Sequence, residues 1–158
     1  MAAQRSVDPP VTEFAGQFFF RLWRATHTRT ADALGSVGLS PALFAVLNVV
    51  GARERAIQQE LGAALGIDRS TMVSLIDELE RAGLARRRPS ASDRRAREIT
   101  ITQKGGRLLK RARALTAQVE DEILAGLSSQ ERRELFDLLR RALESAPAQP
   151  MWNAAESG

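Results

Sequence analysis

One stretch of the sequence, residues 57–102, limits the possible folds more than any other. A short helical pattern over residues 57–65 ends at Gly66, and Asp68 then caps a second helix that we expect to run to about residue 82. One face of this second helix is apolar and is predicted to point into a core: Met72, Leu75, Ile76 and Leu79. The opposite face begins with arginine, serine and threonine. Two short helices joined by a tight turn predict a helix-turn-helix unit.

An arginine-rich hairpin is predicted directly after the second helix. We expect strands over residues 84–88 and 96–102, joined by the turn-forming residues 89–93. In the return strand Ile99 and Ile101 alternate with polar residues, which is the period of a half-buried strand. Arginines lie in or beside this hairpin: Arg86, Arg87, Arg88, Arg94, Arg95 and Arg97. A hairpin in this place is the wing of a winged helix-turn-helix.

Positive charge is concentrated around this hairpin. The chain has 158 residues and a formal net charge of +4. Residues 81–113 hold twelve Lys/Arg against two acidic residues and so carry +10, which leaves −6 for the other 125 residues. Such concentration favours a local site for a polyanion over charge spread for solubility, although a solvated helix face beside a basic loop is the alternative.

Further helices flank the central unit. We expect helices over residues 11–34, 41–50 and 105–128, and a last helix that begins with a Ser128–Glu131 capping box. The helix starting at residue 41 follows Ser40-Pro41, an N-cap and a first-turn proline. The fold class is therefore mainly α with a small β-hairpin. The outer helices exceed what a monomer needs, so we predict a homodimer joined through residues 11–35 and 104–145. Residues 11–145 are predicted to form one domain, in which residues 40–103 are the winged helix-turn-helix. Residues 1–10 are predicted to be a mobile arm, and residues 146–158 a tail.

The segments LSPALFAVLNVV, LGIDRSTMVSLIDELERAGLARR and SDRRAREITITQKG together resemble the MarR family, the multiple antibiotic resistance regulators. The resemblance covers residues 39–106 in motif detail, including Asp93-Arg94-Arg95 followed by Ile101-Thr102. It implies a triangular dimer that binds a pseudo-palindromic operator in double-stranded DNA. It also implies release of that DNA when a small molecule binds.

The candidate DNA-binding residues come from three places. On the second helix Arg69, Ser70, Thr71 and Ser74 are candidates for base and phosphate contacts, although helix capping and surface polarity would also explain them. We expect residues 86–88 to contact phosphate, with at least one facing back into the hairpin, so that Arg86 and Arg88 are the candidates, and Ser40 to offer its backbone N–H. The resemblance places Arg95 in the minor groove, with Arg94 able to exchange roles with it, and gives Asp93 the task of supporting the wing.

The resemblance also implies an effector cleft bordered by the first helix. Its candidate residues are Arg21, Trp23, Arg24 and His27, where arginine would suit a carboxylate or phenolate. A core or interface histidine is the alternative interpretation of His27, the only histidine.

The same features narrow the function classes. The chain has no cysteine, which excludes thiol-based sensing, and no spaced metal-ligand set or nucleotide-binding glycine loop, so we expect no enzyme, no metal and no cofactor other than a small organic effector. It shows no apolar run of membrane-spanning length and no signal peptide, which favours the cytoplasm. A transcriptional repressor released by an aromatic or phenolic effector is the first hypothesis. An architectural DNA-binding protein without an effector is the second.

Overall fold

The computed structural model describes residues 14–53, 56–90 and 97–146. The predicted N-terminal arm and nearly all of the predicted tail lie outside these residues. In chain order the elements are α1 (Ala15–Gly35), α2 (Pro41–Ala52), β1 (Ala56–Ile57), α3 (Gln58–Leu65), α4 (Arg69–Arg81), β2 (Ala85–Pro89), β3 (Arg97–Ile101), α5 (Gln103–Ile123) and α6 (Ser129–Ser145). The fold is mainly helical with one small antiparallel sheet, as predicted.

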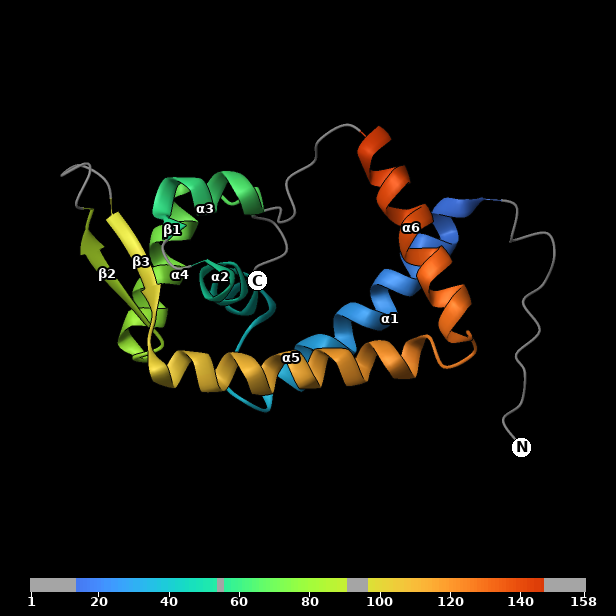
Figure 1. Cartoon of the computed structure of the whole chain (residues 1–158), viewed down its shortest axis with the longest axis horizontal. Coiled ribbons are helices and arrows are strands. Elements are labelled where there is room, and N and C mark those ends of the chain that lie inside the picture. The colour runs from blue at the N-terminus through green and yellow to red at the C-terminus, as the bar shows by residue number, and fades with distance from the viewer. Residues whose placement is uncertain (1–13, 54–55, 91–96, 147–158) are drawn as a thin grey trace.

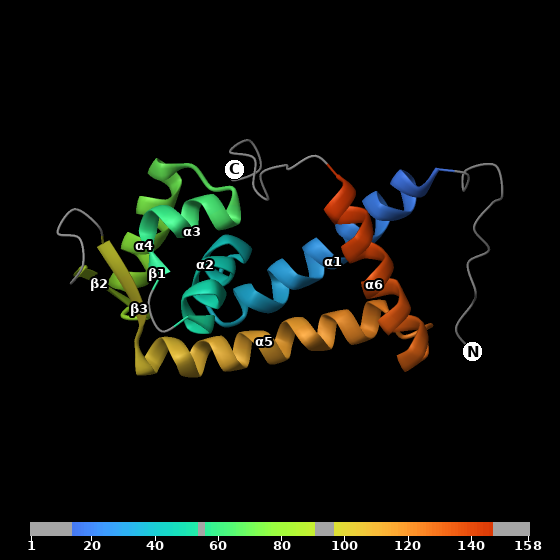
Figure 2. The same cartoon turned by 45° about the horizontal axis from the view of Figure 1, so that its top comes forward.

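The molecule has two parts joined by one long helix. At one end α2, α3, α4 and the sheet form a compact module (Figure 1). The helix α5 runs from that module to the other end, where α6 and the N-terminal half of α1 lie; the turned view shows the same arrangement (Figure 2). The core fills the module and extends onto the adjoining ends of α1 and α5. Its largest fully buried side chains are Leu34, Val46, Leu47, Val50, Leu61, Met72, Ile76, Leu79 and Ile99.

Local signals in the sequence set most element boundaries. Ser40 caps α2, because its Oγ accepts a hydrogen bond from the backbone N–H of Leu43 at 3.2 Å. Gly66 ends α3 in the left-handed conformation with φ 64°, which an L side chain adopts only with strain. Ser128 and Glu131 form the predicted capping box at the start of α6.

Some boundary predictions were wrong. The long helix begins at Gln103, two residues before the predicted start, because the Thr102 side chain caps it and accepts from the Gly105 N–H at 3.0 Å. It ends at Ile123 and not at residue 128. The helix α2 continues to Ala52, beyond the predicted end at residue 50. The two-residue strand β1 was not predicted at all; it pairs with β3, so the sheet has the order β1-β3-β2.

Gly105 fixes how α5 leaves the sheet. A Cβ placed there would lie 2.0 Å from the backbone oxygen of Leu84, closer than any real side chain allows. The same oxygen accepts from the backbone N–H of Thr102 at 3.0 Å and from its Oγ1 at 3.1 Å. The start of β2 and the start of α5 are therefore in backbone contact, which places the hairpin relative to the long helix.

Candidate DNA-binding surface

The first turn of α4 is organised around Asp68. Its carboxylate accepts from the backbone N–H groups of Ser70 at 2.9 Å and Thr71 at 3.0 Å, as an N-cap should. The hydroxyls of the same two residues also donate to it, at 2.5 and 2.6 Å. The hydroxyl bond from Ser70, then that from Thr71, and then the backbone bonds hold the pKa of Asp68 far below its usual range. Asp68 is thus the cap that the sequence predicted.

These bonds determine what the exposed hydroxyls can offer a ligand. Ser70 and Thr71 use their hydrogens on Asp68, and Ser74 donates its hydroxyl hydrogen to the backbone oxygen of Ser70 at 3.2 Å. Their free oxygen lone pairs are acceptors. The first turns of α4 therefore present hydroxyl acceptors beside the guanidinium of Arg69, which is only a donor, and this combination can read both kinds of groups on base edges.

Arg81 extends this face and was not among the predicted site residues. It follows Ser70 by eleven positions and Ser74 by seven, which places all three along one stripe of α4, and all three are exposed. The signal was available in the sequence as helical spacing. Because Arg81 is in the last turn, it carries positive charge to the far end of the stripe.

Arg87 connects α4 to the hairpin. Its Nη2 lies 2.7 Å from Asp77 Oδ1 and its Nη1 lies 3.3 Å from Glu80 Oε2, while its backbone N–H donates to Glu80 Oε1 at 2.7 Å. The side chain is only 24% exposed, and its Nε is buried without a hydrogen-bond partner among the described residues. The Arg87 side chain therefore faces α4 and joins β2 to that helix through Asp77 and Glu80.

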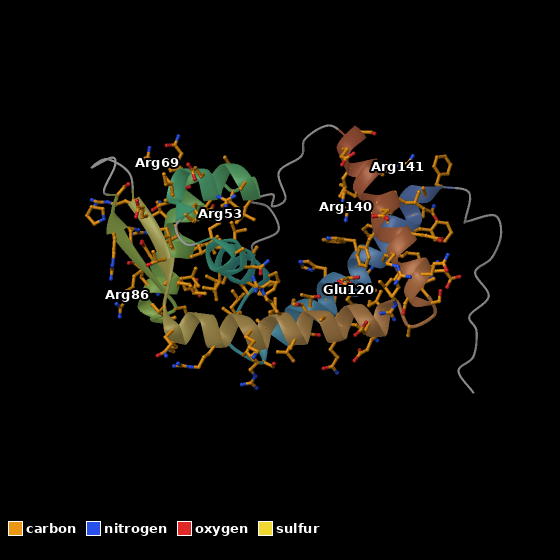
Figure 3. The ribbon with its side chains drawn as sticks, viewed as in Figure 1. Arg53, Arg69, Arg86, Glu120, Arg140 and Arg141 are labelled. Atoms are coloured by element: carbon orange, nitrogen blue, oxygen red, sulfur yellow. The ribbon has the colours of Figure 1, made fainter. Side chains whose placement is uncertain are left out.

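Arg86 and Arg88 point to the other side of the sheet. They are paired in register with Thr100 and Glu98 of β3, and both are exposed. Figure 3 shows Arg69 and Arg86 at opposite ends of the module, with α5 at the end where Arg86 lies. Arg86 is therefore separated from the first turn of α4 by about the length of that helix, roughly 20 Å at 1.5 Å per residue.

The tip of the wing cannot be placed. Asp93, Arg94 and Arg95 lie outside the described residues, so their predicted roles stay predictions. The described part of the hairpin ends with a hydrogen bond of 2.7 Å from the hydroxyl of Ser90 to Glu98 Oε1. This contact closes the hairpin beyond the Arg88–Glu98 pair.

The candidate effector residues all lie on α1 and are exposed in the single chain: Arg21, Trp23, Arg24 and His27. The rings of Trp23 and His27 stack with centroids 5.0 Å apart, and Phe20 stacks on Trp23 at 6.2 Å. The rings of Phe20, Trp23 and His27 thus form an aromatic row on α1, the helix that also carries Arg21 and Arg24. In the described residues no group of His, Cys, Asp or Glu side chains could hold a metal ion.

The outer helices expose large apolar side chains. On α1 and just before it these are Phe14, Phe18, Phe19, Phe20, Leu22 and Trp23, and on α6 they are Phe136, Leu138 and Leu143. Phe14 is 76% exposed and Leu143 is 74% exposed. The helix α6 buries none of its residues. None of the described helices combines the length and the apolar character needed to cross a membrane.

Comparison with known proteins points to one family. A family model described as "MarR family" matches residues 37–96. A transcriptional repressor, CouR, solved on a 23-mer DNA duplex, is 32% identical, with 85% of this chain and 96% of that chain covered and a TM-score of 0.78. The PcaV transcriptional regulator of Streptomyces coelicolor, solved with its natural ligand, is 26% identical, with 91% and 100% covered and a TM-score of 0.71. A MarR-family regulator from a Rhodococcus species is 27% identical, with 79% and 89% covered and a TM-score of 0.73.

Proposed function

The chain belongs to the MarR family of transcriptional regulators, and from this membership we propose that it is a homodimeric repressor in the cytoplasm that binds a pseudo-palindromic operator and releases it on binding a small aromatic or phenolic effector. The observation that carries the proposal is the outer face of α4. It presents exposed hydroxyls and cations without an acidic side chain in its first turn, at the start of a helix supported from behind by a buried core. That is the surface a major groove requires.

In this proposal α4 reads bases and its neighbours hold phosphates. Arg69, Ser70, Thr71 and Ser74 face base edges and adjoining phosphates, the three hydroxyls as acceptors from the amino groups of adenine or cytosine. Arg81, Arg86, Arg88 and the backbone N–H of Ser40 contact phosphates. Arg95 or Arg94 enters the minor groove, with Asp93 as its support. The ion pairs of Arg87 set the angle between α4 and the wing, so that both fit one duplex.

The apolar faces of α1 and α6 support a dimer. Exposed apolar area of this extent on two neighbouring helices is unusual for a monomer. A second copy of the same chain would cover it, because in a twofold dimer the same surface patch of both copies meets, and every contact occurs twice. Two recognition helices could then reach half-sites about 34 Å apart, or a multiple of that distance.

The aromatic row on α1 supports an effector that carries a ring and an acidic group. Trp23 and His27 offer stacking surfaces, and Arg21 and Arg24 offer charge for a carboxylate or phenolate. CouR was solved on DNA and PcaV with a natural ligand, so both halves of the proposed cycle occur among similar proteins. Binding between the dimer helices and the DNA-binding module would change the spacing of the two α4 helices and lower affinity for the operator.

The test begins with selection of genomic DNA fragments on the purified protein, followed by titration of the enriched sequence. We expect a pseudo-palindrome bound at least about 10³-fold more tightly than unrelated DNA at the same salt concentration. Equal affinity for all sequences would refute a regulator and favour an architectural DNA-binding protein. Hydroxybenzoates and related aromatic acids are then titrated into the operator complex. A ligand that binds without changing operator affinity would contradict the effector part of the proposal. For a ligand that does release DNA, the double variant Arg21→Gln, Arg24→Gln should bind that ligand more weakly.

A further inference from the structure

A second cationic surface lies on the first half of α5. This α5 cationic surface consists of four exposed residues: Lys104, Arg107, Lys110 and Arg111. Their spacing places them on the side of the helix opposite the buried residues Gly105, Leu109 and Ala112. None of the four forms an ion pair within the described residues.

The distribution of charge along α5 is unfavourable for the helix itself. The first eleven residues of α5, 103–113, contain five cations and no carboxylate, whereas Glu120, Asp121 and Glu122 lie near its C-terminal end. A helix has partial positive charge at its N-terminus and partial negative charge at its C-terminus, so both groups stand at the wrong end. Neighbouring cations on one face repel each other as well. Lys104 offsets part of this cost, because its Nζ donates to the backbone oxygen of Ala82 at the end of α4 at 2.7 Å. The other three cations have no ion-pair partner among the described residues, and a polyanion would stabilise them.

This surface lies at the end of the module away from the first turn of α4, and it adjoins Arg86, which is proposed to contact operator phosphates. A shallow hollow of about 370 Å³ at the module end of α5 is lined by Lys104 and Arg107 together with Glu80 on α4, Gly83 after that helix and Arg86 on β2. Arg69 stands at the other end of the module (Figure 3). Between these two ends α4 carries three carboxylates: Asp77 and Glu80 are paired with Arg87, whereas Glu78 is exposed and would repel a phosphate backbone beside it.

We propose that the α5 cationic surface binds the phosphate backbone of a second DNA duplex while α4 and the wing hold the operator, so that one dimer bridges two DNA segments. The four residues span seven positions, about 10 Å of helix axis. A duplex carries one negative charge per roughly 1.7 Å, which offers several phosphates within that span. Lysine and arginine are both suited to such contacts, because backbone binding needs charge without base readout. The inference rests on the proposed DNA-binding function.

The experiment is a bridging assay with the full-length protein. A short biotinylated operator duplex is immobilised, loaded with protein, washed, and offered a fluorescent duplex of unrelated sequence. We expect the wild type to retain the second duplex at low salt. The variant K104Q/R107Q/K110Q/R111Q should retain at least tenfold less of the fluorescent duplex, while its operator affinity should change less than about threefold. Glutamine is a good helix former, so α5 should persist, as circular dichroism would verify.

The matched control keeps the charge and changes the side chains. The variant K104R/R107K/K110R/R111K should bridge as well as the wild type, because nonspecific backbone binding depends on the number of cations. Three results would overturn the proposal: equal bridging by the glutamine variant, a parallel loss of operator affinity, or capture of polyglutamate as strongly as DNA. The second would assign the surface to the operator interface, and the third to an acidic protein partner. A wild type that binds no operator would instead refute the proposed function.

Discussion

Replacing Gly105 by alanine should destabilise the protein, whereas the same change at the next residue should stabilise it. The added Cβ of Gly105→Ala would meet the Leu84 backbone oxygen at 2.0 Å, and relief to 3.0 Å requires a shift of 1.0 Å between two backbones. Overpacking of this kind costs about 1–3 kcal/mol. The shift also strains the bond that the Thr102 backbone N–H donates to that oxygen, worth about 1 kcal/mol. The higher helix propensity of alanine stabilises α5 by about 0.5–1 kcal/mol in the opposite direction. The net expectation is a loss of about 1–3 kcal/mol.

Gly106 is the matched control. It lies in the same turn of α5, and a Cβ there would meet nothing within 4 Å. Gly106→Ala should therefore raise the free energy of unfolding by about 0.5–1 kcal/mol. Urea unfolding of both variants at one protein concentration, followed by circular dichroism, measures the two effects with opposite signs expected. Equal stability of the two variants would refute the close backbone contact between β2 and α5.

Three further predictions concern the recognition helix and the dimer. Arg87→Gln should lower operator affinity at least tenfold, because it leaves Asp77 and Glu80 without their cation and removes the side-chain ion pairs between the hairpin and α4. Arg86→Gln should lower affinity less and reduce the salt slope of binding by about one. Fluorescence anisotropy at several salt concentrations distinguishes the two variants. Because the folded-state pKa of Asp68 is lowered, its ionised form stabilises the fold above about pH 4, and that contribution disappears as the pH falls further. Asp68→Asn should therefore lose less stability on acidification than the wild type. An acid-unfolding profile equal to that of the wild type would contradict a stabilising charge on the Asp68 cap. Leu138→Glu on α6 should give monomers in analytical ultracentrifugation, and a variant that stays dimeric would argue against the apolar faces as the dimer contact.

The sequence predicted those parts of the fold in which local chemistry decides the structure. The caps at Ser40, Asp68 and Ser128 and the glycine after α3 each satisfy backbone groups within a few residues, so their positions could be read directly. The pattern of buried residues on α4 was predicted for the same reason, since helical spacing alone determines which side chains share a face.

The rest depends on contacts between distant segments. The strand β1 has two residues, too few for any periodic signal, and exists because Ala56 and Ile57 pair with Ile99 and Glu98 of β3. The start of α5 was placed two residues late because Thr102 was assigned to the strand rather than to the cap. In the candidate site, the ion pairs of Arg87 join two elements, and the sequence does not show that Asp77 and Glu80 of α4 are the residues it meets.

The bare apolar surface of α1 and α6 has a genetic consequence. In the proposed dimer, association uses these two helices, while DNA is read by a module at the far end of α5. A copy that cannot read DNA would still associate normally with an intact copy, and the mixed pair would have a single working module. Because two modules bind one operator together, such mutant alleles should be dominant over the wild type, and alleles that damage α6 should be recessive.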